Sequence, residues 1–218
     1  MSKISKELID RAAKIATSTF ANALDDFQLA DHILPSIKSV APGFRFAGPA
    51  LTVQESVAEA GTYTSADFRV GAMIDAAEPG DVVVVAAGGA NVSTWGGTAS
   101  FAAKKKGVAG LLADAGVRDM EEIVEFEFPV FARHMTPLTG RTRIKVETIG
   151  EPIVVDGVTV EPGDLIVADG TGVVVLPAAQ AAEIIEIAEG FAADDESALK
   201  DLEAGLTFAQ AMAKYTRI

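Results

Sequence analysis

Cysteine is absent from the 218-residue sequence, and histidine, tryptophan and tyrosine are scarce. Without cysteine the chain has no disulfide, no thiolate nucleophile and no cysteine-bound zinc or iron–sulfur centre. No stretch reaches the roughly 18–20 consecutive apolar residues of a membrane-spanning helix. The N-terminus also lacks the apolar run of a signal peptide. We therefore expect a cytoplasmic protein that does not bind membranes.

Positive charge is also in short supply. Eighteen Lys and Arg residues stand against 31 Asp and Glu residues, which gives a formal net charge of −13. Such a surface repels nucleic acid, so no nucleic-acid partner is expected. The basic cluster Lys104–Lys106 is interpreted as the solvated end of a helix. A small anion could still bind where an arginine or a metal ion supplies local positive charge.

Hydrophobic residues make up 49% of the chain but aromatic residues only 6%, so the core must be built from aliphatic side chains. The length suits one compact domain over residues 1–218. Apolar residues at helical spacing predict an amphipathic helix over 3–24, within an N-terminal segment 1–24. C-terminal helices are predicted within 177–218, the long one from Pro177 to about residue 203.

The middle of the chain alternates strands and helices, which is typical of an α/β core. The expected strands are 44–54, interrupted at Pro49, then 82–87, 108–116 and 129–134. Helices are expected over 65–77, from near Gly97 to Gly107, and in 117–126. Short strands follow, with Asp156-Gly157 as a two-residue hairpin turn.

Two loops follow neighbouring predicted strands, where open α/β sheets bind ligands. The first, residues 88–99, is rich in glycine and leads into a helix near Gly97. Free N–H groups and the positive end of the helix dipole would face an anion there. The alternative is a plain glycine-rich connection.

The second loop contains Arg118, Asp119 and Glu122. Arginine offers a planar fork that matches a carboxylate, and aspartate is a hard oxygen ligand of the kind Mg²⁺ prefers. Asp119 could instead be the N-cap of the next helix, with Glu122 reaching back as in a capping box. Both interpretations can hold together, because a helix start directs polar groups at whatever lies beyond it.

Other candidates are weaker. His32 and His134 are far apart in sequence and do not form a zinc motif, so each is interpreted as structural or exposed. Lys145 lies on a predicted strand face with Arg141 and Arg143. It could form a Schiff base, although a solvated strand face is the simpler interpretation.

The segment WGGTASFAAKKKGVAGLLADAGVRDMEEI resembles the core of the RraA-like family, which includes 4-hydroxy-4-methyl-2-oxoglutarate aldolases and regulators of ribonuclease E. Gly97, twenty intervening residues, Arg118-Asp119, two more residues and Glu122 match the signature of the aldolase branch. The likeness runs from about residue 20 to the end. GGTASFAA is also similar to a segment of swivelling phosphohistidine domains, but Phe101 stands where those domains carry the phosphorylated histidine.

The resemblance implies an α/β fold of the swivelling type, a layered β/β/α domain with flanking N- and C-terminal helices. It implies a lyase dependent on Mg²⁺ or another divalent cation such as Mn²⁺, which cleaves a C–C bond of a small 2-oxo acid through a pyruvate enolate. Decarboxylation of oxaloacetate would be a companion activity. A homotrimer or homohexamer with sites at subunit interfaces is expected.

The resemblance also implies roles for single residues. Asp119 would bind the metal, Arg118 would hold the oxo-acid end of the substrate, and Glu122 would help to move a proton. Glu196 falls near the position from which a neighbouring subunit supplies a carboxylate near the metal. The substrate carboxylate would bind at four consecutive residues, with backbone amides of the last three: Gly96, Gly97, Thr98 and Ala99.

One departure concerns Gly97, because several aldolases of the family carry an acidic residue there. Glu122 could compensate for its absence. The regulator branch lacks the aspartate that Asp119 supplies, which favours an enzyme. The alternatives are a non-catalytic, protein-binding regulator of ribonuclease activity with the same fold, and a lyase that acts on a different oxo acid.

Overall fold

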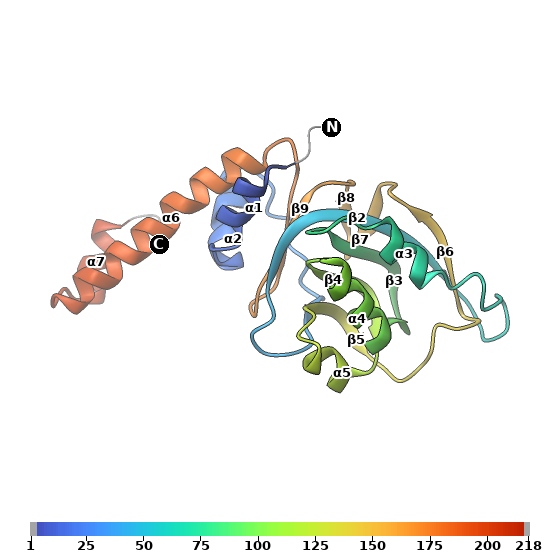
Figure 1. Ribbon diagram of the computed structural model, residues 1–218. Coiled ribbons are helices and arrows are strands. Elements are labelled where there is room, and N and C mark those ends of the chain that lie inside the picture. The colour runs from blue at the N-terminus through green and yellow to red at the C-terminus, as the bar shows by residue number, and fades with distance from the viewer. Residues whose placement is uncertain (1–3, 216–218) are drawn as a thin grey trace.

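The computed structural model describes residues 4–215, which form an α/β core with helices at both ends of the chain (Figure 1). In this part of the chain the helices are α1 (Lys6–Ala12), α2 (Thr17–Asp26), α3 (Val70–Ala76), α4 (Gly97–Lys106), α5 (Met120–Glu125), α6 (Ala181–Glu203) and α7 (Phe208–Lys214). The strands are β1 (Lys38–Ser39), β2 (Phe46–Val57), β3 (Val82–Trp95), β4 (Gly110–Val117), β5 (Val130–Met135), β6 (Ile144–Ile149), β7 (Ile153–Val155), β8 (Val158–Val160), β9 (Leu165–Ala168) and β10 (Val173–Leu176). None of the described helices is long and apolar enough to cross a membrane.

The main sheet has the strand order β1-β5-β4-β3-β2-β9-β10, and β6 also pairs with β2. Strands β2, β3, β4 and β5 are parallel to one another, whereas β1, β6, β9 and β10 pair in antiparallel fashion. The hairpin of β7 and β8 forms a separate two-stranded sheet. The parallel strands end at one common edge, and α4 and α5 begin there.

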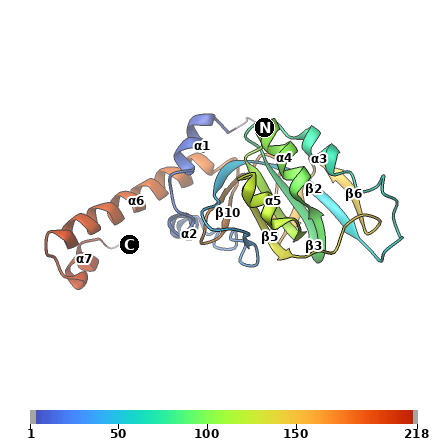
Figure 2. The same cartoon turned by 60° about the horizontal axis from the view of Figure 1, so that its bottom comes forward.

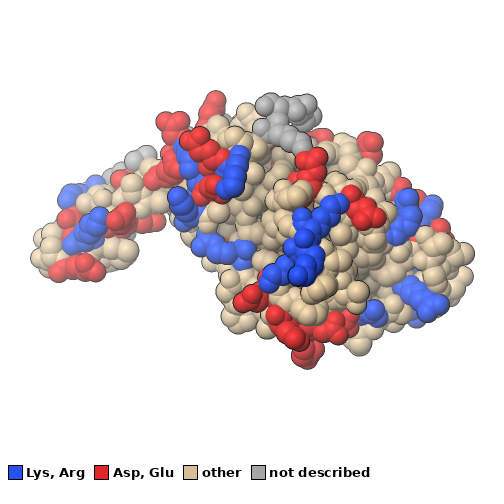
Figure 3. Space-filling model, viewed as in Figure 1, with Lys and Arg blue, Asp and Glu red and all other residues tan. Residues whose placement is uncertain are grey.

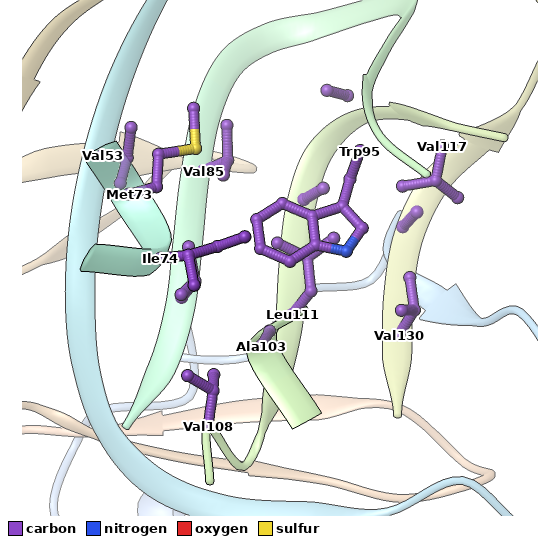
Figure 4. Packing of buried hydrophobic residues seen from close by; sticks show 14 of the residues in the cluster. Val53, Met73, Ile74, Val85, Trp95, Ala103, Val108, Leu111, Val117 and Val130 are labelled. Atoms are coloured by element: carbon purple, nitrogen blue, oxygen red, sulfur yellow. The ribbon is translucent and has the colours of Figure 1, made fainter. Parts of the chain in front are cut away.

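Three groups of buried side chains hold the layers together. Helices α3, α4 and α5 lie on one face of the sheet (Figures 1 and 2), over an aliphatic cluster that surrounds Trp95 and Leu111 (Figure 4). The other face packs against the β7–β8 hairpin, which contributes Val155 and Val160. Helices α1, α2 and α6 cover β9 and β10. The layered α/β fold with flanking helices, expected from the resemblance, is therefore confirmed.

Helix α6 leaves this core as a projecting arm with α7 near its far end (Figures 1 and 2). Its first half buries Ile184, Ile185 and Ala188 against the core. In the second half, Ala198 is buried, but Leu199 and, on α7, Phe208 are largely exposed. The arm is therefore held by its first half.

The helix predicted over 3–24 is two helices, and its predicted start at residue 3 lies outside the described residues. The second helix begins at Thr17, whose backbone N–H and hydroxyl both donate to Asp169, at 2.8 and 2.7 Å. Asp169 thus caps α2 from the loop between β9 and β10. The apolar periodicity of residues 3–24 gives no sign of this cap, because Asp169 is distant in sequence, and the segment therefore looks like one helix.

Strand β2 is continuous, so the predicted interruption at Pro49 is wrong. Pro49 pairs with Leu165 of β9, and the parallel ladder with β3 begins only at Ala50. Proline has no N–H to donate, but the ladder with β3 loses no hydrogen bond because it begins after Pro49.

Helix α3 begins at Val70 rather than at residue 65, because residues 64–69 form a turn in which Asp67 accepts from Thr64.

Most of the predicted loop 88–99 is also strand. Strand β3 runs on to Trp95 and keeps irregular pairing with β4. Gly88 and Gly89, with positive φ angles of 62° and 75°, lie within the first register shift, between Ala86 and Ala90. The following helix begins at Gly97 and ends at the left-handed Gly107, as predicted.

The Asp156-Gly157 hairpin is likewise confirmed, with φ angles of 50° and 88°. Helix α6 begins four residues after Pro177, because Pro177 and Gln180 close a turn before it.

Candidate functional site

The two loops singled out in the sequence lie side by side at the carboxyl edge of β3 and β4. The parallel register aligns Trp95 with Val117, and Arg118 N–H donates to the Trp95 carbonyl at 3.0 Å. The residues that follow each strand, Gly97 and Asp119, are therefore brought together although 22 positions separate them. This juxtaposition is the feature that the strand order predicted.

Asp119 stands at the N-cap position of α5 but does not cap that helix. Its backbone is left-handed (φ 59°, ψ 49°) and its side chain makes no cap hydrogen bond. Instead, its Oδ2 accepts the N–H of Gly97, the first residue of α4, at 3.1 Å. The alternative interpretation, a capping box with Glu122, is therefore wrong, and the carboxylate is directed at the positive end of the neighbouring helix. Asp and Asn tolerate this backbone region better than most residues.

Arg118 lies next to this carboxylate. Its Nε is 3.4 Å from Asp119 Oδ2, and the two side chains are 46% and 37% exposed. The other oxygen, Asp119 Oδ1, has no hydrogen bond within residues 4–215. One carboxylate oxygen and a guanidinium fork thus remain accessible to a ligand.

Glu122 of α5 packs directly on Gly97. A Cβ atom at Gly97 would lie 2.6 Å from Glu122 Cβ and would overlap its carboxylate, so the glycine is required by close approach. The carboxylate of Glu122 therefore fills the space that a side chain at position 97 would occupy. At Gly96 a Cβ would similarly lie 3.2 Å from Arg118 Nε.

A cavity of about 360 Å³ opens at this edge of the sheet. Its polar lining includes Arg118 and Asp119, and its apolar wall includes Phe68 and Ile74. The backbone N–H groups of Thr98 and Ala99, in the first turn of α4, have no acceptor among the described residues. The predicted residues that line the cavity are Gly96, Thr98, Ala99, Arg118 and Asp119.

Hydrogen bonds and packing hold the turn between β3 and α4. The indole Nε1 of Trp95 donates to Ser100 Oγ at 3.0 Å, and that hydroxyl donates to the Gly96 carbonyl at 3.1 Å. Ser93 Oγ donates to the Trp95 carbonyl at 2.8 Å. Because Trp95 is itself buried in the core (Figure 4), the first turn of α4 is fixed before any ligand arrives.

Glu196 does not join this group within the chain. It lies on the projecting half of α6, its side chain is 69% exposed, and it pairs with Lys200 at 2.7 Å. The hydrogen bond from Lys200 holds the pKa of Glu196 below its ordinary value. The structure therefore gathers the other predicted site residues and leaves Glu196 on the arm.

The weaker candidates have ordinary structural partners. The rings of His32 and His134 are hydrogen-bonded to backbone carbonyls of Val175 and Gly89, as structural histidines would be. Lys145 pairs with Glu147 at 2.8 Å, and this partner raises the lysine pKa. A Schiff-base lysine needs a lowered pKa, so that interpretation is disfavoured.

The basic cluster is the last turn of α4, as interpreted from the sequence (Figure 3). Lys106 donates to the carbonyls of Ile74 and Asp75 at the end of α3. Lys104 binds the Phe126 carbonyl just after α5 and pairs with Glu127. Two of the lysines thus satisfy the ends of neighbouring helices rather than forming an anion site.

A buried glutamate behind the cavity was not among the predicted site residues. Thr94 lines the cavity, and its hydroxyl donates to the buried Glu55 of β2 at 2.7 Å. A signal was available, because the two-residue period of the strand places Glu55 on the same face as Val53 and Val57. A glutamate on an apolar strand face requires an explanation.

No group of three His, Cys, Asp or Glu side chains within residues 4–215 is arranged to hold a metal ion. Among the described residues that line the cavity, Asp119 is the one carboxylate. This donor set fits Mg²⁺, which often binds through one or two carboxylates and completes its shell with water and substrate oxygens. It does not fit zinc, which needs three or four protein ligands.

Comparison with known proteins bears on this site. A family model described as RraA-like (Aldolase/RraA) matches residues 17–175. A protein of Halalkalibacterium halodurans, provisionally named a 4-hydroxy-4-methyl-2-oxoglutarate aldolase, is 31% identical over 198 residues, or 90% of this chain and 89% of that protein.

Two solved structures share the fold over nearly the whole chain. A protein from Pseudomonas syringae pv. tomato has a TM-score of 0.89 and 29% identity, covering 98% of this chain and 96% of its own. Streptomyces coelicolor RraAS2, described as an unusual member of the RNase ES inhibitor RraA protein family, has a TM-score of 0.77 and 25% identity, covering 94% and 100%. With the two loops, Asp119 and Arg118 in place, these matches show that the chain belongs to the RraA-like family.

Proposed function

We propose that the protein is a divalent-metal-dependent lyase that cleaves a C–C bond of a small 2-oxo acid through a pyruvate enolate. The observation that supports this proposal is the meeting of Asp119, Arg118 and the free amides of α4 in one cavity. Relatives named as 4-hydroxy-4-methyl-2-oxoglutarate aldolases suggest that compound as a substrate. Decarboxylation of oxaloacetate forms the same enolate, so oxaloacetate is the second proposed substrate.

The proposed substrate binds with its carboxylate at the N-terminus of α4. The N–H groups of Thr98 and Ala99 donate to the carboxylate, and the helix dipole favours its negative charge. The close approach depends on Gly96 and Gly97, which present backbone without a Cβ. The guanidinium of Arg118 then lies beside the oxo group.

Cleavage of the C–C bond places negative charge on the substrate, and the residues that stabilise this charge are the ones proposed to act in catalysis. Breaking the bond β to the ketone leaves an enolate, and Arg118 supplies fixed positive charge near its oxygen. Asp119 would hold the Mg²⁺ or Mn²⁺ ion through the oxygen that has no hydrogen bond within the described residues. When bound, such an ion supplies Lewis acidity that stabilises the same negative charge.

A proton must leave the hydroxyl of an aldol substrate and another must reach the enolate carbon. Glu122 is the proposed proton carrier, because its carboxylate lies against Gly97, and Gly97 stands between the lining residues Gly96 and Thr98. It occupies the space that a side chain at position 97 would take, so in this proposal it supplies the carboxylate that the resemblance leads us to expect at that position. Glu196 would act from the arm of a neighbouring subunit in a homotrimer or homohexamer.

The alternative function is a non-catalytic regulator of ribonuclease activity, motivated by the similarity to RraAS2. A regulator needs neither a left-handed aspartate nor free helix amides in a cavity. Backbone in a sparsely populated region costs of order 1–3 kcal/mol, and such residues cluster at functional sites. The conformation of Asp119 therefore favours the enzyme.

The test is a coupled assay of pyruvate release from 4-hydroxy-4-methyl-2-oxoglutarate and from oxaloacetate, with Mg²⁺ and with EDTA. Asp119→Asn is the informative variant, because asparagine tolerates the left-handed backbone and can still accept from Gly97. Glu121→Gln is the matched control, since it removes an exposed carboxylate from the same helical turn outside the cavity lining. Turnover lost with EDTA and in Asp119→Asn but kept in Glu121→Gln is expected. Folded protein without turnover on either compound would favour the regulator or a different oxo acid.

A further inference from the structure

The charged groups of the cavity lie together at the carboxyl edge of the sheet. Arg118 and Asp119 are the two charged side chains among the described residues that line it, and both follow β4. The first turn of α4, with the N–H groups of Thr98 and Ala99, begins at the same place. In the proposed function these groups hold the carboxylate and the oxo group of the substrate, so the guanidinium of Arg118 is already in use.

The wall that α3 and α4 form is apolar. Lys106 at the end of α4 donates to the Ile74 carbonyl near the end of α3 at 2.8 Å, so the two helices lie side by side (Figures 1 and 2). Val70 and Ile74 are four positions apart and share the face of α3 that lines the cavity. Ala102 lines it from the second turn of α4. The groups on the far carbon of a bound substrate would therefore lie against aliphatic side chains.

Phe68 completes this apolar wall, and packing fixes its ring. A Cβ atom at Gly140 would lie 3.0 Å from Phe68 Cε2, so the ring lies directly on that glycine. The turn that contains Phe68 is held by Thr64, whose backbone N–H and hydroxyl donate to Asp67 at 2.8 and 2.7 Å. The wall is therefore formed before any ligand arrives.

The cations closest to this wall along the chain bind backbone carbonyls. Arg69, just before α3, donates to the Val146 carbonyl at 2.9 Å. Arg143 donates at 3.1 Å to the carbonyl of Thr139, itself a lining residue. A carboxylate against the wall would lose water without gaining a cation, which costs free energy, whereas an alkyl group gains from the same burial. The volume of about 360 Å³ is at the low end for ligand pockets, so the group must also be small.

We propose that the chain acts on 4-hydroxy-2-oxo acids whose C4 carries small apolar groups, so that the second product is a neutral ketone or aldehyde. This inference rests on the proposed lyase function and names its substrate class. The C3–C4 bond breaks and its electron pair forms the enolate of pyruvate. The C4 hydroxyl loses its proton to Glu122 as C4 becomes a carbonyl carbon, and C3 then takes up a proton. Because 4-hydroxy-4-methyl-2-oxoglutarate carries a carboxylate on C4, it should be the poorer substrate.

Two unreactive 2-oxo acids test the wall without turnover. 4-Methyl-2-oxopentanoate carries two methyl groups on C4, whereas 2-oxoglutarate carries a carboxylate there. In calorimetric titration of Mg²⁺-saturated protein, the first should bind at least about tenfold more tightly than the second.

A cation introduced at the wall should change this preference. Ala102→Lys adds one from an exposed position of the lining, and the ratio of the two dissociation constants should move at least about tenfold towards 2-oxoglutarate. Ala76→Lys is the matched control, because it places the same charge on an exposed alanine of α3 outside the lining. It should leave the ratio unchanged.

The corresponding aldols test turnover. 4-Hydroxy-4-methyl-2-oxopentanoate yields pyruvate and acetone, and 4-hydroxy-4-methyl-2-oxoglutarate yields two molecules of pyruvate. The ratio of their kcat/KM values, counted per cleavage, should move towards the dicarboxylate in Ala102→Lys but not in Ala76→Lys. Comparing variants cancels the difference in intrinsic reactivity between the two compounds.

The outcomes distinguish this inference from the proposed function. Tighter binding of 2-oxoglutarate by wild type, or a ratio of dissociation constants that Ala102→Lys leaves unchanged, would overturn the apolar substrate class. Cleavage of either aldol would then leave the lyase standing. Pyruvate from neither aldol, together with the expected preference in binding, would contradict the lyase but support the apolar wall as the part of the cavity that selects the ligand.

Discussion

Replacing Glu55 with glutamine should stabilise the protein relative to wild type, and this gain in the free energy of unfolding should grow as the pH rises. The carboxyl is 3% exposed, and burial raises its pKa from 4.5 to about 7. In the unfolded chain the group ionises near its ordinary value, whereas in the folded chain it keeps its proton to higher pH. The folded state thus binds more protons between these two values, and wild-type stability falls with rising pH there.

The magnitude follows from the two pKa values. A rise from 4.5 to about 7, at about 1.4 kcal/mol per pH unit, gives a loss of about 3 kcal/mol that is complete just above pH 7. The sequence pI of about 4.5 makes work near that pH impractical. Between pH 5.5 and 8.5 the stability difference between Glu55→Gln and wild type should therefore grow by about 2 kcal/mol in favour of the variant.

The assay is equilibrium urea unfolding of both proteins at several pH values in this range. Glu147→Gln is the matched control on the neighbouring strand, because Lys145 holds the pKa of Glu147 below its ordinary value. Glu147 is ionised in both states throughout the range, so that variant should differ from wild type by a constant amount. A constant difference for Glu55→Gln as well would show that Glu55 does not keep its proton to higher pH in the folded protein.

Three further substitutions test the packing around the site and the core. Gly97→Ala should destabilise by about 1–3 kcal/mol, because its Cβ would meet Glu122 Cβ at 2.6 Å; unchanged thermal stability would contradict this close approach. Thr52→Val should gain about 1 kcal/mol in urea unfolding, because it removes a buried hydroxyl with no hydrogen-bond partner within residues 4–215; a loss would contradict that. Arg133→Met should cost about 3 kcal/mol or more, because buried Asp114 loses the cation 2.5 Å away; a neutral effect in urea unfolding would argue against this pair.

Local sequence signals predicted the elements that local chemistry controls. The start of α4 at Gly97 was predicted, and its end follows from the left-handed conformation of Gly107, which glycine adopts readily. The break between α1 and α2 could not be predicted, because its cause is a cap from Asp169, 152 positions away from Thr17. Periodicity within the N-terminal segment contains no information about that contact.

The site shows the same division. The strand order was enough to bring Gly97 and Asp119 together, because parallel neighbours end at one edge. The direction of the Asp119 side chain was not predictable from the capping pattern. Its carboxylate accepts the N–H of Gly97 in α4 instead of an N–H of α5, the helix that it precedes. Glu55 was recognisable from strand alternation, but its bond to Thr94 depends on how β3 continues past its glycines.

The most direct test of the proposed lyase is exchange of the methyl hydrogens of pyruvate in D₂O, followed by proton NMR. Enolate formation is the step shared by every proposed substrate, so this measurement does not depend on which aldol or oxaloacetate the protein uses. We expect exchange that requires Mg²⁺, disappears with EDTA and in Asp119→Asn, and persists in Glu121→Gln. Exchange no faster than with Mg²⁺ and buffer alone, from folded protein, would contradict the proposed lyase.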